Sequence, residues 1–439
     1  MNIAFQDFAP SEEDYSSSAP ASPQDGATLH FVLKLALLVL FVPQELSFFI
    51  GDLRLTFERL LFLLITPLVF VRLARKVSTG HYRFVASDLF VPLTAFWMFI
   101  GPTVTEGLGD ALRHSGPVVL EYLISYLATR TLLSGHRSSL IFVTWLCVVI
   151  AAVVADALLD PITGRYITQE LCGQITGYTA VGYNSDNFRF GLLRATGPVE
   201  HPILFGFVSA IGLLLAATLK IRWRKLCIAA CALGVVMSFS SAPQQSVLLG
   251  FCLLLYGRVF AGLRSKWLLI GVALASALAI LFISTPTPFG HIFNLTAINP
   301  ETAYFRLYVW NMIGPVVLQN PYFGVPDGSY GYEGSVDSLW LVLAMVYGVP
   351  CGILTAMSMI GCCSRPTGVS RAGLSEEETK LGTTLGIIIF MTIYMGFTVH
   401  FWGEVWILIG LLMGVRAHLG ELGATSNVVL RYHPIDWAT

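Results

Sequence analysis

Charged residues are scarce in this chain. Its 439 residues include 26 Lys and Arg and 27 Asp and Glu, so charged residues make up 12% of the sequence. A soluble domain carries about twice that share, and disordered or basic nucleic-acid-binding chains have a large net charge, whereas the net charge here is −1. With 55% hydrophobic residues and a mean hydropathy of +0.70, the composition indicates a protein that crosses a membrane many times. At about 20 apolar residues per crossing, some ten to thirteen spans fit the length.

The sequence also lacks the common cofactor and metal motifs. Seven of the eight cysteines lie in or beside apolar runs, and none shows a zinc or disulfide spacing. It contains no phosphate-binding loop, no HExxH, no GxSxG and no Asp-x-Asp. We therefore expect neither a cofactor nor a metal ion.

Hydropathy predicts an all-α polytopic membrane protein of about twelve transmembrane helices. The predicted spans are 31–50, 55–71, 85–104, 117–133, 138–156, 199–219, 226–241, 246–261, 267–284, 338–360, 383–399 and 403–417. Two polar loops interrupt them, at about 157–198 and 285–337, and the second is expected to carry short amphipathic helices.

The chain divides into one large domain and two tails. Residues 1–29 are polar and acidic and lack the positive start of a signal peptide, so they are expected to be a disordered cytoplasmic tail. Residues 30–419 form the predicted transmembrane catalytic domain, and residues 420–439 a cytoplasmic tail. With twelve spans, eighteen Lys and Arg fall on one side and seven on the other. The richer side is cytoplasmic by the positive-inside rule, so both termini lie inside and both long loops face outward.

The first informative motif leads into the sixth span. It reads Arg194-Ala-Thr-Gly-Pro-Val-Glu-His-Pro and ends at Pro202. Arg194 offers a planar fork of donors suited to phosphate oxygens, and Pro202 is tolerated in a first helical turn. Glu200 and His201 then lie at a helix N-terminus near the outer surface. The alternative is an interfacial arginine beside an ordinary helix start.

The second motif occupies the later loop. It comprises Arg306-Leu-Tyr-Val-Trp-Asn, then Asn320-Pro-Tyr-Phe-Gly, and then Asp337 just before the tenth span. The segment 303–318 is predicted to be an amphipathic helix lying on the membrane. Asp337 is either a catalytic carboxylate or merely a cap for the helix that follows it.

Three further residues are candidates for glycan contact. Arg189 lies in the first large loop, and His400 and Glu404 lie in the predicted outer turn between the last two spans. An interfacial aromatic belt is the alternative for the turn, and a solvated loop is the alternative for Arg189.

Together the two motifs resemble the O-antigen ligase and Wzy-type polymerase superfamily of bacterial envelope glycosyltransferases. Such enzymes transfer a glycan from undecaprenyl diphosphate, on the outer leaflet, to an acceptor sugar hydroxyl, without nucleotide or metal. The resemblance implies that Arg194 and Arg306 bind the diphosphate. Two departures disfavour a ligase: Asp337 stands where ligases carry a histidine, and Ser238-Phe-Ser-Ser lacks the arginine of the family's Ser-x-Ser-Arg.

We therefore predict a polymerase of O-antigen, capsule or exopolysaccharide repeat units in the bacterial inner membrane, with its site facing the periplasm. The alternatives are an O-antigen ligase that acts on lipid A core, and a transporter or lipid flippase. Asp337 is the first candidate for the general base, with His201 and Glu200 next. The expected partners are the undecaprenyl-diphosphate-linked oligosaccharide, membrane lipids and, optionally, a chain-length regulator, with no nucleic acid.

Overall fold

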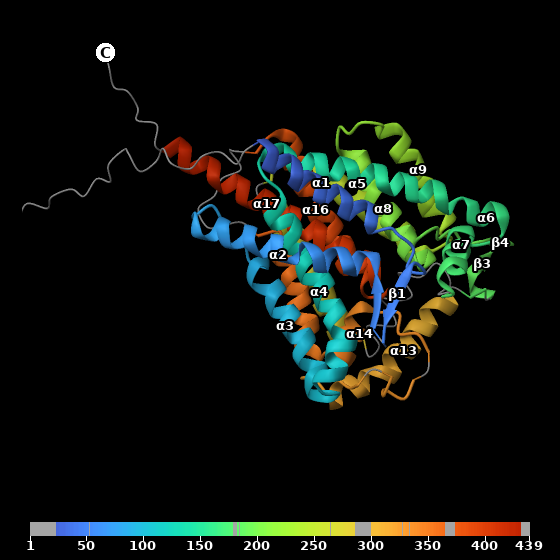
Figure 1. Cartoon of the computed structure of the whole chain (residues 1–439). Coiled ribbons are helices and arrows are strands. Elements are labelled where there is room, and N and C mark those ends of the chain that lie inside the picture. The colour runs from blue at the N-terminus through green and yellow to red at the C-terminus, as the bar shows by residue number, and fades with distance from the viewer. Residues whose placement is uncertain are drawn as a thin grey trace, which may run out of the picture.

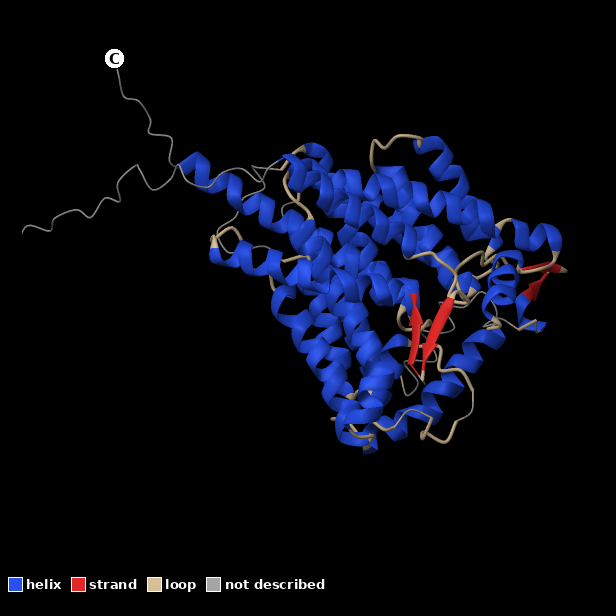
Figure 2. Cartoon of the chain, viewed as in Figure 1, coloured by secondary structure: helices blue, strands red, loops and turns tan. Residues whose placement is uncertain are grey.

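In the computed structural model most of the described chain is helical (Figures 1 and 2). The structure describes residues 23–51, 53–178, 182–183, 185–263, 265–285, 300–326, 328–332, 334–364 and 374–431. The predicted tail segment 1–22, the loop segment 286–299 and the last residues, 432–439, lie outside the described residues.

Sixteen helices are described along the chain. They are α1 (Pro23–Val39), α2 (Phe57–Ser78), α3 (Ser87–Thr105), α4 (Leu108–Leu132), α5 (His136–Ala157), α6 (Leu159–Thr163), α7 (Ile167–Thr176), α8 (Pro202–Thr218), α9 (Arg224–Met237), α10 (Ser241–Val259), α11 (Lys266–Ser284), α13 (Pro300–Gln319), α14 (Leu339–Val346), α15 (Val349–Gly361), α16 (Glu376–Met395) and α17 (Gly403–Arg431). Two antiparallel hairpins interrupt them, β1 (Ser47–Ile50) with β2 (Leu53–Thr56) and β3 (Phe188–Arg189) with β4 (Leu192–Leu193).

A helix lies at the position of every predicted span, with two differences in detail. The first span was predicted to reach residue 50, but α1 ends at Val39 and the strand β1 follows Pro43, because proline has no N–H with which to continue a helix. The tenth is divided into α14 and α15 at Gly348, whose φ of +88° is open to glycine but rarely to other residues. The helix α13 extends over the predicted segment 303–318.

Both predicted tails are partly helical. The helix α1 already begins at Pro23, inside the segment 1–29 that was expected to be disordered, because proline suits a first helical turn. The helix α17 continues to Arg431, past residue 419, because no proline interrupts the sequence before Pro434.

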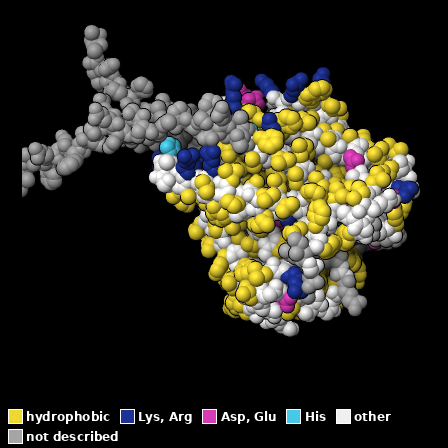
Figure 3. All heavy atoms as spheres, in the orientation of Figure 1, with side chains coloured by type: hydrophobic (Ala, Val, Ile, Leu, Met, Phe, Trp, Pro, Cys, Tyr) yellow, Lys and Arg dark blue, Asp and Glu magenta, His cyan; other side chains and the backbone are white. Residues whose placement is uncertain are grey.

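Within the part of the chain that the structure describes, three helical stretches are long and apolar enough to cross a membrane, namely Ser87–Thr105, Arg137–Thr163 and Gly403–Leu422. Shorter apolar helices lie beside them. Hydrophobic side chains cover most of the face seen in Figure 3, whereas Lys and Arg gather near its margins.

Two central helices, α8 and α17, organise the packing. The helix α8 is buried along nearly its whole length among α5, α9, α10 and α16. The helix α17 packs closely on α4 because Gly410 and Gly414 face it: a Cβ at these positions would come within 2.0 Å of Ser125 Oγ and 2.1 Å of Thr129 Oγ1. This is the small-residue contact that brings helix backbones together in membranes.

A buried ionic network ties four segments together next to this contact, at the C-terminal end of α4. Arg130 has no exposed surface, and its guanidinium binds both carboxylate oxygens of Asp88 at 3.0 Å. It also donates to Glu421 Oε2 at 2.5 Å and to the Arg83 carbonyl at 2.7 Å, and it lies over the Tyr82 ring at 4.3 Å. The network therefore joins α3, α4, α17 and the connection between α2 and α3.

We expect Arg130→Met to destabilise the protein by about 3–5 kcal/mol, because it leaves the Asp88 and Glu421 carboxylates without their buried partner. Thermal unfolding in detergent measures the effect. The matched control is Arg137→Met at an exposed position. Equal unfolding midpoints for the two variants would show that the network does not stabilise the fold.

Candidate active site

The predicted catalytic residues Glu200 and His201 lie directly before α8. His201 is the N-cap of this helix, and its Nδ1 accepts a hydrogen bond from the Ile203 backbone N–H at 3.2 Å. Pro202 occupies the first helical turn, as the sequence predicted. Because Nδ1 is an acceptor here, the proton of neutral His201 lies on Nε2. His201 therefore suits the role of a hydrogen-bond donor better than that of a general base.

The start of α17 brings a second set of predicted residues to the same place. Trp402 Nε1 donates to Glu200 Oε2 at 2.6 Å, and the Glu200 backbone N–H donates to Glu404 Oε1 at 3.4 Å. The Trp402 ring lies 5.9 Å from that of His201 and 5.5 Å from that of His400. Glu200, His201, His400 and Glu404 thus form one cluster, although about 200 residues separate the two pairs in the sequence.

Two arginines and two carboxylates that the sequence analysis did not single out adjoin this cluster. Arg59 Nε lies 2.7 Å from Glu121 Oε1, and Glu58 is buried beside this pair. Arg54 bonds Ser47 across the β1–β2 hairpin. Arg54 and Arg59 interact electrostatically with Glu200. The sequence could have pointed to Arg54 and Arg59 as site residues, because both fall on the predicted outer side, away from the main cationic clusters.

Arg194 is buried, with 7% of its surface exposed, and is hydrogen-bonded to the protein on all three nitrogens. Its Nε donates to the Ser238 carbonyl at 3.0 Å, one terminal nitrogen to the Asp186 carbonyl at 3.2 Å and the other to Ser240 Oγ. Burial and the nearby charge of Arg189 lower the pKa of Arg194 to about 10. Arg194 therefore fastens the loop before α8 to the turn between α9 and α10.

Arg306 has a different environment. It lies on α13 with 7% of its surface exposed, and within the described chain it donates no hydrogen bond. Burial lowers its pKa, and the nearby Asp337 and Tyr394 oppose this shift. A buried guanidinium without acceptors is costly, so this position is prepared for an anion.

Asp337 is not the cap of the helix that follows it. Ser338 is the N-cap of α14, where its hydroxyl accepts the Leu341 N–H at 3.4 Å. The Asp337 carboxylate instead accepts a hydrogen bond from Ser335 Oγ at 2.5 Å. Burial raises the pKa of Asp337, while Ser335 and Arg306 counteract the rise. A carboxylate with a raised pKa beside an unpaired arginine is a good candidate for a general base.

One connection links the pair of Arg306 and Asp337 to the Glu200 cluster, and another links it to α10. The loop between α16 and α17 accepts the Leu339 N–H at its Val399 carbonyl at 3.0 Å, one residue before His400. On the other side, the Tyr394 hydroxyl donates to Gln245 Oε1 at 3.0 Å on α10, the helix whose N-cap is Ser240.

The two predicted diphosphate ligands thus approach the same end of α10 from different sides. Arg194 bonds the N-cap residue Ser240 directly, whereas Arg306 approaches Gln245 through Tyr394. Arg189, the remaining predicted glycan contact, is exposed on β3. In the part of the chain that the structure describes, no group of three or more His, Cys, Asp or Glu side chains is placed to hold a metal ion.

Comparison with known proteins adds no relative. The sequence matches no family model, and no curated protein is significantly similar to it.

The pKa of His400 predicts how stability depends on pH. Burial lowers this pKa from 6.5 to about 4. Between these values the unfolded chain binds more protons than the folded one, so stability falls as the pH drops from about 6.5 towards 4. We expect His400→Phe to flatten the pH dependence of the unfolding midpoint, with His81→Phe at an exposed position as control. An unchanged slope in His400→Phe would contradict the buried neutral imidazole.

Proposed function

We propose that the protein is a membrane glycosyltransferase that polymerises undecaprenyl-diphosphate-linked oligosaccharide repeat units. The observation that carries the proposal is the buried Arg306, whose guanidinium donates no hydrogen bond within the described chain and lies beside the Asp337 carboxylate. It combines an anion site with a proton acceptor, which are the two functions that this reaction needs. The motifs that resemble O-antigen polymerases and ligases supply the reaction class.

In this proposal the protein crosses the bacterial inner membrane twelve times. Its spans are α1, α2, α3, α4, α5, α8, α9, α10, α11, the pair α14 and α15, α16 and α17. The positive-inside rule puts both termini in the cytoplasm and the Glu200 cluster at the periplasmic side. The apolar surface with cations near its margins supports this arrangement (Figure 3).

In the proposed reaction the acceptor sugar hydroxyl attacks the anomeric carbon of the donor glycan. The hydroxyl proton passes to the Asp337 carboxylate as the new C–O bond forms. The bond between the anomeric carbon and the diphosphate oxygen breaks, and its electron pair leaves with undecaprenyl diphosphate. Arg306 stabilises the negative charge that develops there. Arg194 holds the adjoining loop, and we propose that Glu200, His201, His400, Glu404 and Arg189 contact sugar hydroxyls.

The product separates a polymerase from a ligase. In a deletion strain, loss of a polymerase leaves single repeat units, whereas loss of a ligase leaves long chains on the polyprenyl carrier. Gel analysis of surface and carrier-linked glycan distinguishes these results. Normal surface glycan in the deletion strain would exclude both enzymes.

We expect the two arginines to respond differently to substitution by methionine. Arg306→Met should reduce chain growth by about 10²–10³-fold without lowering the unfolding midpoint, because the Arg306 guanidinium donates no hydrogen bond within the described chain that the substitution would break. Arg194→Met should lower the midpoint, because the Ser238 carbonyl and Ser240 lose their donor. Polymer length and thermal unfolding are the measurements.

Arg306→Lys should restore little activity, because lysine lacks the planar fork. The control is Arg222→Met at an exposed position, which should retain both polymer and stability. Long polymer in cells that carry only Arg306→Met would rule out the diphosphate role.

The pH profile tests Asp337 as the base. Asp337→Asn should slow chain growth by about 10²–10⁴-fold at unchanged protein level. In the parent enzyme, activity should fall as the pH drops through the raised pKa of Asp337. Ser335→Ala removes a hydrogen bond that favours the charged carboxylate, so the acid limb should move to higher pH. An acid limb that Ser335→Ala leaves in place would argue against Asp337.

A further inference from the structure

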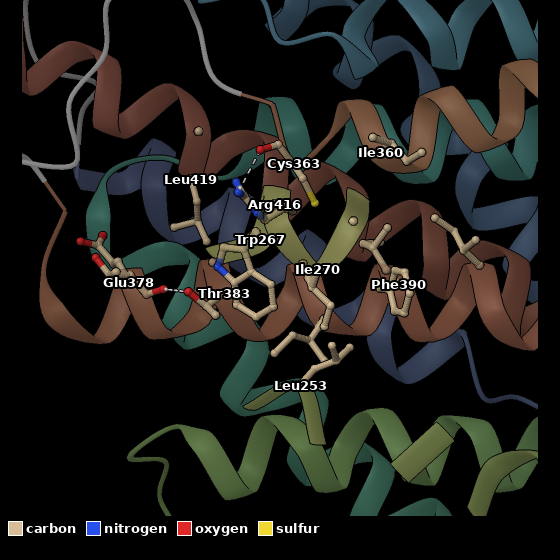
Figure 4. A pocket seen from close by; sticks show the side chains of 18 of the residues that line it. Leu253, Trp267, Ile270, Ile360, Cys363, Glu378, Thr383, Phe390, Arg416 and Leu419 are labelled. Carbon is tan, nitrogen blue, oxygen red and sulfur yellow. Dashed lines mark hydrogen bonds between the residues drawn. The ribbon is translucent and has the colours of Figure 1, made fainter. Parts of the chain in front are cut away.

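An apolar cavity lies among α10, α11, α15, α16 and α17 (Figure 4). Its volume is about 430 Å³. Along α16 its lining extends from Glu378 to Ile393, which corresponds to about 22 Å at 1.5 Å per residue. The cavity is therefore long enough for an extended hydrocarbon chain, and most of its lining side chains are apolar.

The helix α11 forms one wall of the cavity but does not pack closely on α16, which forms the opposite wall. Near its start, the Tyr256 hydroxyl donates to the Lys266 carbonyl at 2.6 Å, and the Trp267 ring lies 5.9 Å from that of Tyr256. From residue 271 to residue 280 every position is exposed, although Ser276 is the only polar residue in this stretch. An apolar helix without a buried face needs hydrocarbon around it, including on the side that faces the cavity.

The opposite wall is open at two glycines. Gly382 and Gly386 of α16 have the spacing that brings membrane helices together, but no helix covers them. A Cβ at Gly382 would have only Leu419 Cδ1 nearby, at 4.0 Å, and one at Gly386 only Cys363 Sγ, at 3.7 Å.

One end of the cavity carries a positive charge. The half-buried guanidinium of Arg416 donates to the Cys363 carbonyl at 3.2 Å, and its Nε has no partner in the described structure (Figure 4). The carboxylate of Glu378, also in the lining, accepts the Ser375 N–H at 2.8 Å in the capping box of α16. Arg416 is thus available to an anionic group at the end of an apolar channel.

We propose that this cavity binds an anionic glycerophospholipid, with an acyl chain between α11 and α16 and its phosphate on Arg416. Arg416 follows Glu404 by twelve residues on α17, which places it about 18 Å from the candidate active site along the helix. The headgroup therefore lies at the opposite end from the site of the lipid diphosphate. The inference rests on the membrane location proposed above and not on the glycosyl transfer.

The test compares lipid binding in three purified variants and the parent protein. Gly386→Leu fills the channel without a steric clash, and Gly352→Leu on α15, where a Cβ would also meet nothing, is the matched control. Arg416→Gln removes the charge. Each protein is stripped with detergent and titrated with mixed micelles of phosphatidylglycerol or phosphatidylcholine with identical acyl chains, and bound lipid is measured by native mass spectrometry.

The parent and Gly352→Leu should bind phosphatidylglycerol roughly tenfold more tightly than phosphatidylcholine, as one charge-assisted phosphate contact provides. Gly386→Leu should lose both lipids, and Arg416→Gln should lose the preference. Undiminished binding by Gly386→Leu, equal binding of the two lipids by the parent, or a polyprenyl phosphate as the lipid that co-purifies would each overturn the proposal. Because no sugar substrate is involved, its failure is separate from failure of the polymerase assignment.

Discussion

The pairing of buried Arg130 with Asp88 and Glu421 is the constraint on which the helix arrangement depends. A guanidinium without exposed surface must have acceptors for its donors, because an unpaired charge inside the protein is costly. Those acceptors come from α3, from α17 and from the connection between α2 and α3. Together with the close contact of Gly410 and Gly414 with α4, they fix how the longest helices cross.

The candidate active site also contains buried arginines, and these differ in whether the protein provides acceptors for their nitrogens. Arg194 resembles Arg130 in that the protein satisfies all three of its nitrogens, so it positions the loop before α8. Arg306 is buried to the same extent but donates to no acceptor among the described residues. A fold tolerates such a cost where a ligand compensates for it, which is why Arg306 and Asp337 carry the functional proposal.

Two pairs of glycines with the same four-residue spacing have different neighbours in this fold. On α17, Gly410 and Gly414 allow α4 to approach until no space remains. On α16, Gly382 and Gly386 face the cavity beside α11, where only the ends of Leu419 and Cys363 come near. The spacing alone therefore predicts a close approach but does not say whether a helix or a lipid makes it.

The sequence by itself determined where the helices lie and the types of residue at their ends, because hydropathy and helix-breaking residues act over a few neighbouring positions. It also identified His201 and Pro202 as a helix start. Only the tertiary structure decided that Ser338, not Asp337, caps α14, and that Arg194 is satisfied whereas Arg306 is not. It also brought Arg54 and Arg59 to Glu200 and Glu58 to Glu404. Hydrogen-bond partners come from segments hundreds of residues apart, and packing of the whole chain determines which of them meet.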